Sequence, residues 1–213
     1  MRLSPITWPR LVTQLADRVE RLTPADGGLW PRVAVDGAPA ARAGWVAAGL
    51  AEELRLLGRQ VRRVPAAGFL RPASLRLEYG HQDADAYHDL WLDGDALFRE
   101  VFTPLDPGGT GRILPDLRDP VTDRSTRSPY VELPPGTVVL VDGPLLQGRW
   151  FPFDLTVYLR MSAAALARRT PSEEQWTLPA FARYEEETRP AESADIVVRA
   201  DDPERPAWSG GSG

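Results

Sequence analysis

Lysine and cysteine are both missing from this 213-residue chain, and each absence narrows its chemistry. All 25 of its lysine-plus-arginine residues are arginine, so any cationic clamp on a phosphate must be made of guanidinium groups. Without cysteine there is no disulfide, no thiolate nucleophile and no thiolate metal ligand. No stretch reaches the roughly 18 consecutive apolar residues of a membrane helix, and no signal-peptide pattern opens the sequence. We therefore expect a cytoplasmic protein that does not enter a membrane.

A strongly basic charge is also lacking. The net charge is −5, which argues against a nucleic-acid partner because such partners need a basic face. The hydrophobic content of 43% is enough for a core, and the length fits one domain. We predict a single domain over residues 1–208, with residues 209–213 as an appended linker and a small molecule as the partner. A homodimer is left open.

The stretch around which the chain is organised is residues 32–57. A β-branched run is followed by the turn Asp36-Gly37, then by apolar residues at helical spacing that stop at Gly58. Strand, glycine turn and helix are the layout of a phosphate-binding loop, G-x-x-x-x-G-K-[S/T]. Counted from Gly37, the second glycine, the lysine and the hydroxyl of that pattern fall on Arg42, Ala43 and Gly44. The stretch is therefore either an ordinary strand, turn and helix, or a phosphate loop without its chemistry.

The remaining segments alternate between short strands and helices. Such alternation predicts an α/β fold with a mostly parallel sheet and helices on both of its faces. The expected helices are residues 3–22, residues 79–101 with a break at Gly94, residues 162–169 and residues 172–188. The expected strands are residues 33–35, 60–64, 137–141, 155–159 and 195–199, and residues 103–127 form a long loop or an irregular hairpin.

In this order the segments resemble the uridine kinase-like (nucleoside kinase) branch of the P-loop phosphotransferases, over roughly residues 30–203. The resemblance implies a three-layer α/β/α fold with a small lid. It rests on collinear segments at residues 32–57 (phosphate loop and helix), 63–72 (RVPAAGFLRP), 87–97 (YHDLWLDGDAL), 104–109 (PLDPGG), 116–118 (DLR), 138–143 (VVLVDG), 166–169 (LARR) and 194–198 (ADIVV).

The departures from the family all affect one mechanism. The family's lysine falls on Ala43 and its Mg²⁺-binding hydroxyl on Gly44; its catalytic aspartate falls on Ala67 and the nearby histidine on Leu70. A kinase supplies little besides positioning and electrostatic stabilisation, so these losses remove most of its catalysis. We expect no cofactor, with ATP and Mg²⁺ bound only if the altered loop still works. We also expect Arg42 and Trp45 to fill the phosphate space, with Arg42 paired to Asp142.

Other positions that match the family keep their side chains. From the resemblance and from the acidic segment around His88 we take two sets of candidates. The catalytic candidates are Asp93, His88, Asp89 and Asp142, because imidazole and carboxylate groups can serve acid–base chemistry. The ligand-binding candidates are Tyr87, Trp91, Phe69, Arg118, Arg168 and Arg169, and the former phosphate loop comprises Gly37, Arg42, Gly44 and Trp45. His81 and His88 would lie about 10 Å apart on one helix, so no metal site is expected.

Three functions fit these residues. The favoured hypothesis is an ATP-independent small-molecule enzyme that uses acid–base residues of the former nucleoside pocket on an aromatic or nucleoside-like substrate. The alternative is a non-catalytic pseudokinase that binds a nucleotide, a metabolite or a protein partner. The third is an ATP-dependent kinase with a non-standard loop in which Arg42 replaces the lysine.

Overall fold

The computed structural model describes residues 3–210. Most of the expected linker, residues 211–213, lies outside that range, while Ser209 hydrogen-bonds to Val197 through its backbone N–H and its hydroxyl. The helices are α1 (Trp8–Glu20), α2 (Ala43–Leu56), α3 (Ala73–Arg76), α4 (Ala84–Asp89), α5 (Gly94–Leu97), α6 (Ala163–Arg169), α7 (Leu178–Glu187) and α8 (Pro190–Ser193). The strands are β1 (Ser4–Pro5), β2 (Arg32–Asp36), β3 (Val61–Pro65), β4 (Arg112–Ile113), β5 (Val131–Glu132), β6 (Val138–Gly143), β7 (Leu155–Arg160), β8 (Ile196–Arg199) and β9 (Ala207–Trp208).

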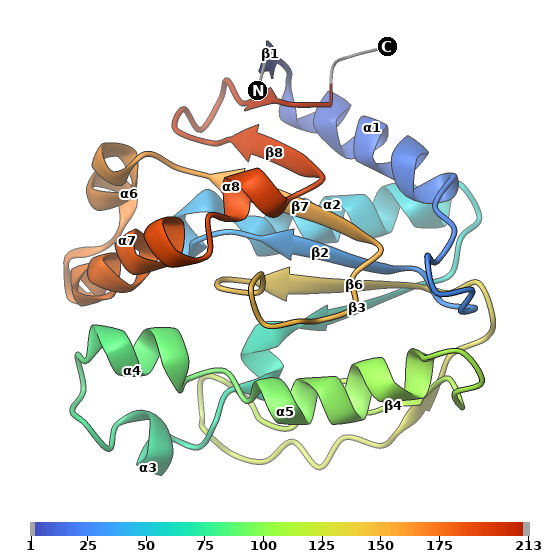
Figure 1. Cartoon of the computed structure of the whole chain (residues 1–213), viewed down its shortest axis with the longest axis horizontal. Coiled ribbons are helices and arrows are strands. Elements are labelled where there is room, and N and C mark those ends of the chain that lie inside the picture. Colours follow the sequence, from blue (N-terminus) through green and yellow to red (C-terminus); the bar gives the residue numbers. More distant parts are fainter. Residues whose placement is uncertain (1–2, 211–213) are drawn as a thin grey trace.

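Seven of these strands form one sheet in the order β1-β9-β8-β7-β2-β6-β3. The five strands from β8 to β3 are parallel, and β9 and β1 complete the edge in antiparallel pairings. Strands β4 and β5 pair separately, so the residues expected as a loop or hairpin (103–127) contribute only β4, and its partner strand lies beyond them. Helices cover both faces of the large sheet (Figure 1). The predicted three-layer α/β class is therefore confirmed.

Strand β2 shows why the core has two halves. Its side chains alternate between the faces, so Val33 and Val35 join the cluster under α1 and α2, while Ala34 joins the cluster under α5. All five residues of β2 are buried, as expected for a central parallel strand. Helix α2 presents small residues such as Ala47 and Ala51 to the sheet, which lets it pack closely.

Two predicted helices begin later than expected. Thr7 caps α1, so this helix starts at Trp8, because the preceding residues Ser4 and Pro5 pair with β9 instead. The segment at residues 172–188 is a 3₁₀ helix, η5 (Ser172–Thr177), followed by α7. The break at Gly94 is confirmed: α4 ends at Asp89, and α5 restarts at Gly94 and continues as the π-helix η3 (Phe98–Phe102).

The carboxyl ends of the parallel strands meet at one edge of the sheet, which is the usual place for a ligand in an open α/β fold. In Figure 1 that edge lies on the left, with α4, α6 and α7 gathered around it. Two 3₁₀ turns, η1 (Pro39–Ala41) and η2 (Ala66–Phe69), follow β2 and β3 there. No helix within residues 3–210 is long and apolar enough to cross a membrane.

Candidate functional site

The turn after β2 uses several of its backbone donors internally. In η1 the N–H groups of Ala41 and Arg42 donate to the carbonyls of Ala38 and Pro39 at 2.8 and 3.0 Å. The N–H of Trp45 donates to the Arg42 carbonyl at 2.9 Å, and Pro39 has no N–H to offer. A phosphate-binding loop needs such groups to point together at the anion. With these three donors used inside the turn and none on Pro39, fewer N–H groups remain to converge on an anion.

Arg42 and Trp45 do not fill the phosphate space as expected. Arg42 has a left-handed backbone (φ 66°), and its guanidinium lies over the Trp45 ring, 5.0 Å from the centroid. Trp45 is 47% exposed and meets the ring of Trp8 edge-on, at a centroid distance of 5.8 Å. The expected pairing of Arg42 with Asp142 is wrong, since Arg42 stacks on the outer surface and Asp142 has another partner.

That partner is Arg63, from the neighbouring strand β3. Arg63 Nε and Nη2 donate to the two carboxylate oxygens of Asp142 at 2.5 and 2.8 Å, and Asp142 is only 5% exposed. The pair touches the first turn of α2, because a Cβ built on Gly44 would lie 2.9 Å from Arg63 Nη2 and 3.2 Å from Asp142 Oδ2. In the resemblance, the residue at position 44 carries a hydroxyl that binds Mg²⁺. Here the guanidinium of Arg63 lies beside position 44 instead.

Mg²⁺ and ATP do not fit these residues. Both oxygens of Asp142 are engaged by Arg63, Gly44 has no hydroxyl, and Ala43 has no charge. Mg²⁺ requires oxygen ligands, and the triphosphate requires a cation and converging N–H groups. Within residues 3–210, no three His, Asp or Glu side chains come together as a metal site either.

Beside the ion pair lies a cavity of about 480 Å³, which we call the aromatic cavity. It is bounded by the carboxyl ends of β3 and β6, by α4 and by η5. Three rings meet edge-on or tilted in its wall: Tyr87–Trp91 at 5.0 Å, Trp91–Trp176 at 5.5 Å and Tyr87–Trp176 at 5.6 Å between centroids. Burial raises the pKa of Tyr87, so its hydroxyl stays protonated. The complete lining is Pro39, Arg63, Pro65, Ala66, Ala67, Leu70, Tyr87, Trp91, Leu92, Asp142, Gly143, Pro144, Leu145, Arg149, Glu174, Trp176 and Thr177.

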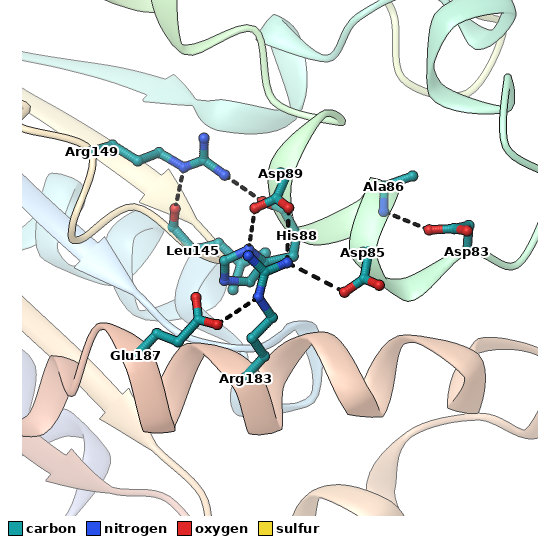
Figure 2. A network of polar contacts seen from close by, with 9 residues as sticks. All are labelled: Asp83, Asp85, Ala86, His88, Asp89, Leu145, Arg149, Arg183 and Glu187. Atoms are coloured by element: carbon teal, nitrogen blue, oxygen red, sulfur yellow. Dashed lines mark hydrogen bonds and ion pairs between the residues drawn. The ribbon is translucent and has the colours of Figure 1, made fainter.

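A smaller cavity of about 170 Å³ adjoins the aromatic cavity and contains the His88–Asp89 pair. His88 Nδ1 lies 2.6 Å from Asp89 Oδ1, while Asp89 Oδ2 accepts from Arg183 of α7 at 2.8 Å (Figure 2). Burial opposes a low pKa for Asp89, but the hydrogen bonds from His88 and Arg183 outweigh it, so the pKa is lowered. The Tyr184 ring packs edge-on against His88 at 6.3 Å.

The other sequence candidates lie outside both cavities. Phe69 is fully buried in the core beneath α5, and Asp93 caps α5 by accepting from the Ala96 N–H at 3.0 Å. Arg118 donates to the Asp123 carbonyl. Of the pair on α6, Arg168 is exposed and Arg169 donates to the Ala200 carbonyl at 2.8 Å. The structure therefore brings Tyr87, Trp91 and Asp142 together in one cavity and His88 with Asp89 in the next.

Most of the cavity lining was not among the sequence candidates, including three residues that matter to the site: Arg63, Arg149 and Trp176. The sequence did contain a sign that Arg63 is unusual, because it is a charged residue inside a strand. That strand, β3, pairs with the buried strand β6. Arg149 follows β6 by a few residues, at the edge where ligands bind in such folds. Trp176 gave no local signal, because its ring reaches Tyr87 only through the packing of η5 over α4.

Comparison with solved structures identifies the fold. A possible uridine kinase from Bacillus stearothermophilus is 21% identical with a TM-score of 0.71, covering 88% of this chain and 97% of its own. A protein assigned as a fructose transport system kinase from Silicibacter sp. TM1040 is 23% identical with a TM-score of 0.60, covering 89% and 95%. The YGR205w protein is 10% identical with a TM-score of 0.55, covering 91% and 93%. No protein-family model and no curated protein matches the sequence. The chain thus has a P-loop kinase-like fold, as its motifs predicted.

Proposed function

We propose that this protein binds a planar small molecule in the aromatic cavity and does not transfer phosphoryl groups from ATP. The observation that carries the proposal is the Arg63–Asp142 ion pair, which occupies both oxygens of the one carboxylate at the metal position. Phosphoryl transfer depends on cations and donors placed around the phosphates. In this chain the N–H groups of Ala41 and Arg42 are used within the turn, and the cation beside it, Arg63, is tied to a carboxylate.

The size and lining of the aromatic cavity support the binding half of the proposal. A volume of about 480 Å³ lies in the range of small-molecule sites, which are mostly apolar with a few polar groups. Tyr87, Trp91 and Trp176 offer ring faces and edges against which a flat molecule can stack. The Bacillus stearothermophilus relative is named as a possible uridine kinase. A molecule of nucleoside size would also match the volume and the lining of the aromatic cavity.

Binding without catalysis is favoured because no histidine lines the aromatic cavity, and of its two carboxylates only Glu174 is without an ion-pair partner among residues 3–210. Asp142 is neutralised by Arg63, and Asp93 is engaged as a helix cap. The kinase hypothesis with Arg42 in place of lysine loses support because Arg42 stacks on Trp45, at the outer surface. The two remaining candidates are a binding protein and an ATP-independent enzyme, and neither transfers phosphoryl groups.

The test uses 2-naphthamide, a neutral planar probe, and MgATP. We expect the probe to quench tryptophan fluorescence, and Trp91→Leu combined with Trp176→Leu to weaken its binding by about tenfold or more. Trp150→Ala is the matched control, since Trp150 is 94% exposed and lines neither cavity. MgATP at about 1 mM should leave the melting temperature within about 1 °C, because only a bound ligand stabilises the native state. A clear MgATP shift, or probe binding that ignores both tryptophans, would contradict the proposal.

A second candidate, an ATP-independent enzyme, rests on the His88–Asp89 pair. Asp89 orients the ring through Nδ1, and Nε2 makes no hydrogen bond to any residue in the described range, as in a histidine poised to act as a general base. Uridine incubated without ATP would then change in mass with the wild type and not with His88→Ala. An unchanged mass with both proteins leaves binding as the function.

A further inference from the structure

Arg149 is half-buried, and it differs from the other buried or half-buried arginines in what it contacts. Its Nε donates to the Leu145 carbonyl at 2.8 Å and its Nη2 to the His88 carbonyl at 2.6 Å, both uncharged acceptors. Within residues 3–210 no carboxylate lies within ion-pair distance of it. By contrast, Arg32 pairs with Asp26 and Asp154, Arg63 with Asp142, and Arg76 with Asp123.

The charge of Arg149 is not neutralised by its surroundings. Burial lowers its pKa, but a guanidinium remains protonated in proteins. Asp89 acts on it only from a distance and is already shared by His88 and Arg183 (Figure 2). Asp36 is fully buried, and that burial raises its pKa, which favours the uncharged acid. Arg71 adds a like charge nearby. A buried charge without a counter-charge is costly unless something supplies one.

The free end of Arg149 is available to a ligand. The side chain lines the aromatic cavity, and its third nitrogen, Nη1, makes no hydrogen bond to a described residue. In Figure 2 this nitrogen points away from the Leu145 and His88 carbonyls. Those two carbonyls hold the guanidinium in place, so little side-chain freedom is left to lose on binding.

We propose that Arg149 is the anchor for an oxyanion, and that the natural ligand of the aromatic cavity is a planar ring carrying a carboxylate or phosphate group. The proposal rests on the proposed function, since it names the ligand class of the same cavity. Guanidinium groups recognise carboxylate and phosphate by charge-assisted hydrogen bonds. Arg63, the other arginine in the lining, is the weaker anchor for an anion, because the carboxylate of Asp142 already neutralises its charge. The rings of Tyr87, Trp91 and Trp176 then hold the planar part.

The experiment compares probes of one shape and different charge: 2-naphthoate, 2-naphthyl phosphate and the neutral 2-naphthamide. We expect the wild type to bind at least one of the two anions about tenfold or more tightly than the amide. Arg149→Gln should remove that preference while leaving amide binding within about twofold. Arg99→Gln is the control, since Arg99 is an exposed arginine outside the cavity that pairs with Glu100. If 2-naphthoate binds more tightly than 2-naphthyl phosphate, the natural ligand carries a carboxylate; the opposite order indicates a phosphate.

A stability measurement separates an anchoring role from a structural one. Because Arg149 is half-buried without a counter-charge, Arg149→Gln should keep or raise the melting temperature, whereas Arg32→Gln, which breaks a buried ion pair, should lower it. Equal binding of amide and anions, or an Arg149→Gln protein that keeps the anion preference, overturns the oxyanion anchor and leaves the proposed function standing. If none of the three probes binds, both proposals are overturned.

Discussion

At the residue scale, the most constrained carboxyl group is Asp36, the last residue of β2. It is fully buried, and its Oδ2 accepts from the Tyr184 hydroxyl and, at 3.4 Å, from the backbone N–H and side-chain amide of Gln147. Its Oδ1 has no partner. Burial raises the pKa of Asp36 and exceeds the opposing effect of these hydrogen bonds. Asp36 therefore favours the protonated form in the native state.

This burial predicts a pH dependence that Asp36→Asn removes. Below about pH 4, near the ordinary carboxyl value, both native and unfolded states hold the proton and stability is unaffected. As the pH rises, the unfolded state ionises first, so the free energy of unfolding falls until the raised native pKa is passed. Urea unfolding at pH 4, 5.5 and 7 should show the variant gaining stability relative to wild type as pH rises. A difference that stays constant over this range would mean that Asp36 is ionised in the native state.

At the scale of elements, Arg183 joins α7 to α4. It contacts Asp89 at 2.8 Å and Asp85 at 3.3 Å on α4, and Glu187 at 2.9 Å on its own helix. The two joined segments carry the rings of the aromatic cavity, since Tyr87 lies on α4 and Trp176 lies just before α7. In Figure 2 the Arg183 side chain rises from α7 into the carboxylates of α4. These ion pairs hold together two walls of the cavity.

Arg183→Gln should loosen the cavity without unfolding the protein. The contacts are exposed and contribute little to global stability, so the urea midpoint should change little. Hydrogen exchange at residues 172–188 should become faster, and 2-naphthamide should bind a few-fold more weakly. High salt should weaken binding to the wild type in the same way and affect the variant less. Arg55→Gln is the control, since it removes a pair with Glu52 within α2 and a long hydrogen bond to the Val61 carbonyl, and neither contact involves α4 or α7. Unchanged exchange in residues 172–188 would show that the ion pairs do not hold α7.

The elements with a strong local pattern were predictable, and those decided by distant contacts were not. The strands at β2, β6 and β7 have short β-branched runs, and α2 ends at Gly58 in a left-handed conformation. Strands β1 and β9 are two residues each and are formed through distant pairings, β9 with β8 and β1 with β9. The same division holds for the site. Tyr87 and Trp91 share one segment, but Arg63, Arg149 and Trp176 enter the aromatic cavity through tertiary packing.

Phe69 shows how a motif position can mislead. The resemblance placed it at the ligand, yet its ring is fully buried in the cluster beneath α5. A phenylalanine in a loop fits a pocket wall and a core equally well by residue type, and only the path of the chain decides. At η2 the turn directs Phe69 inward and leaves Ala66, Ala67 and Leu70 to line the cavity.

At the scale of the whole molecule, the two ends of the described chain are tied at one edge of the sheet. Ser4 pairs with Trp208, and the Trp8 indole donates to the Pro203 carbonyl at 2.6 Å. In Figure 1 both ends lie side by side at the top of the molecule. Trp208 is 6% exposed and belongs to the core cluster that includes α1 and α2. The last strand therefore packs on the same core as the first helix.

If residues 1–208 are a single domain, weakening this edge should destabilise the whole chain at once. Trp208→Ala should lower the free energy of unfolding by about 3–5 kcal/mol, the usual cost of removing a buried tryptophan side chain. Fluorescence and circular dichroism should still report one transition with a common midpoint. Trp150→Ala, at an exposed position, should stay within about 0.5 kcal/mol of wild type. Two separate transitions would indicate that the edge strands unfold independently of the sheet.

The ion pair beside α2 also couples positions 44 and 63 in any series of mutations that adds a hydroxyl to this loop. A threonine at position 44 would bring its Cβ to 2.9 Å from Arg63 Nη2, so the guanidinium would have to shift against the carboxylate of Asp142 that it contacts. Replacing Arg63 first leaves the buried Asp142 without its counter-charge. Either change alone therefore disturbs Asp142, and the effect of one substitution depends on which residue stands at the other position.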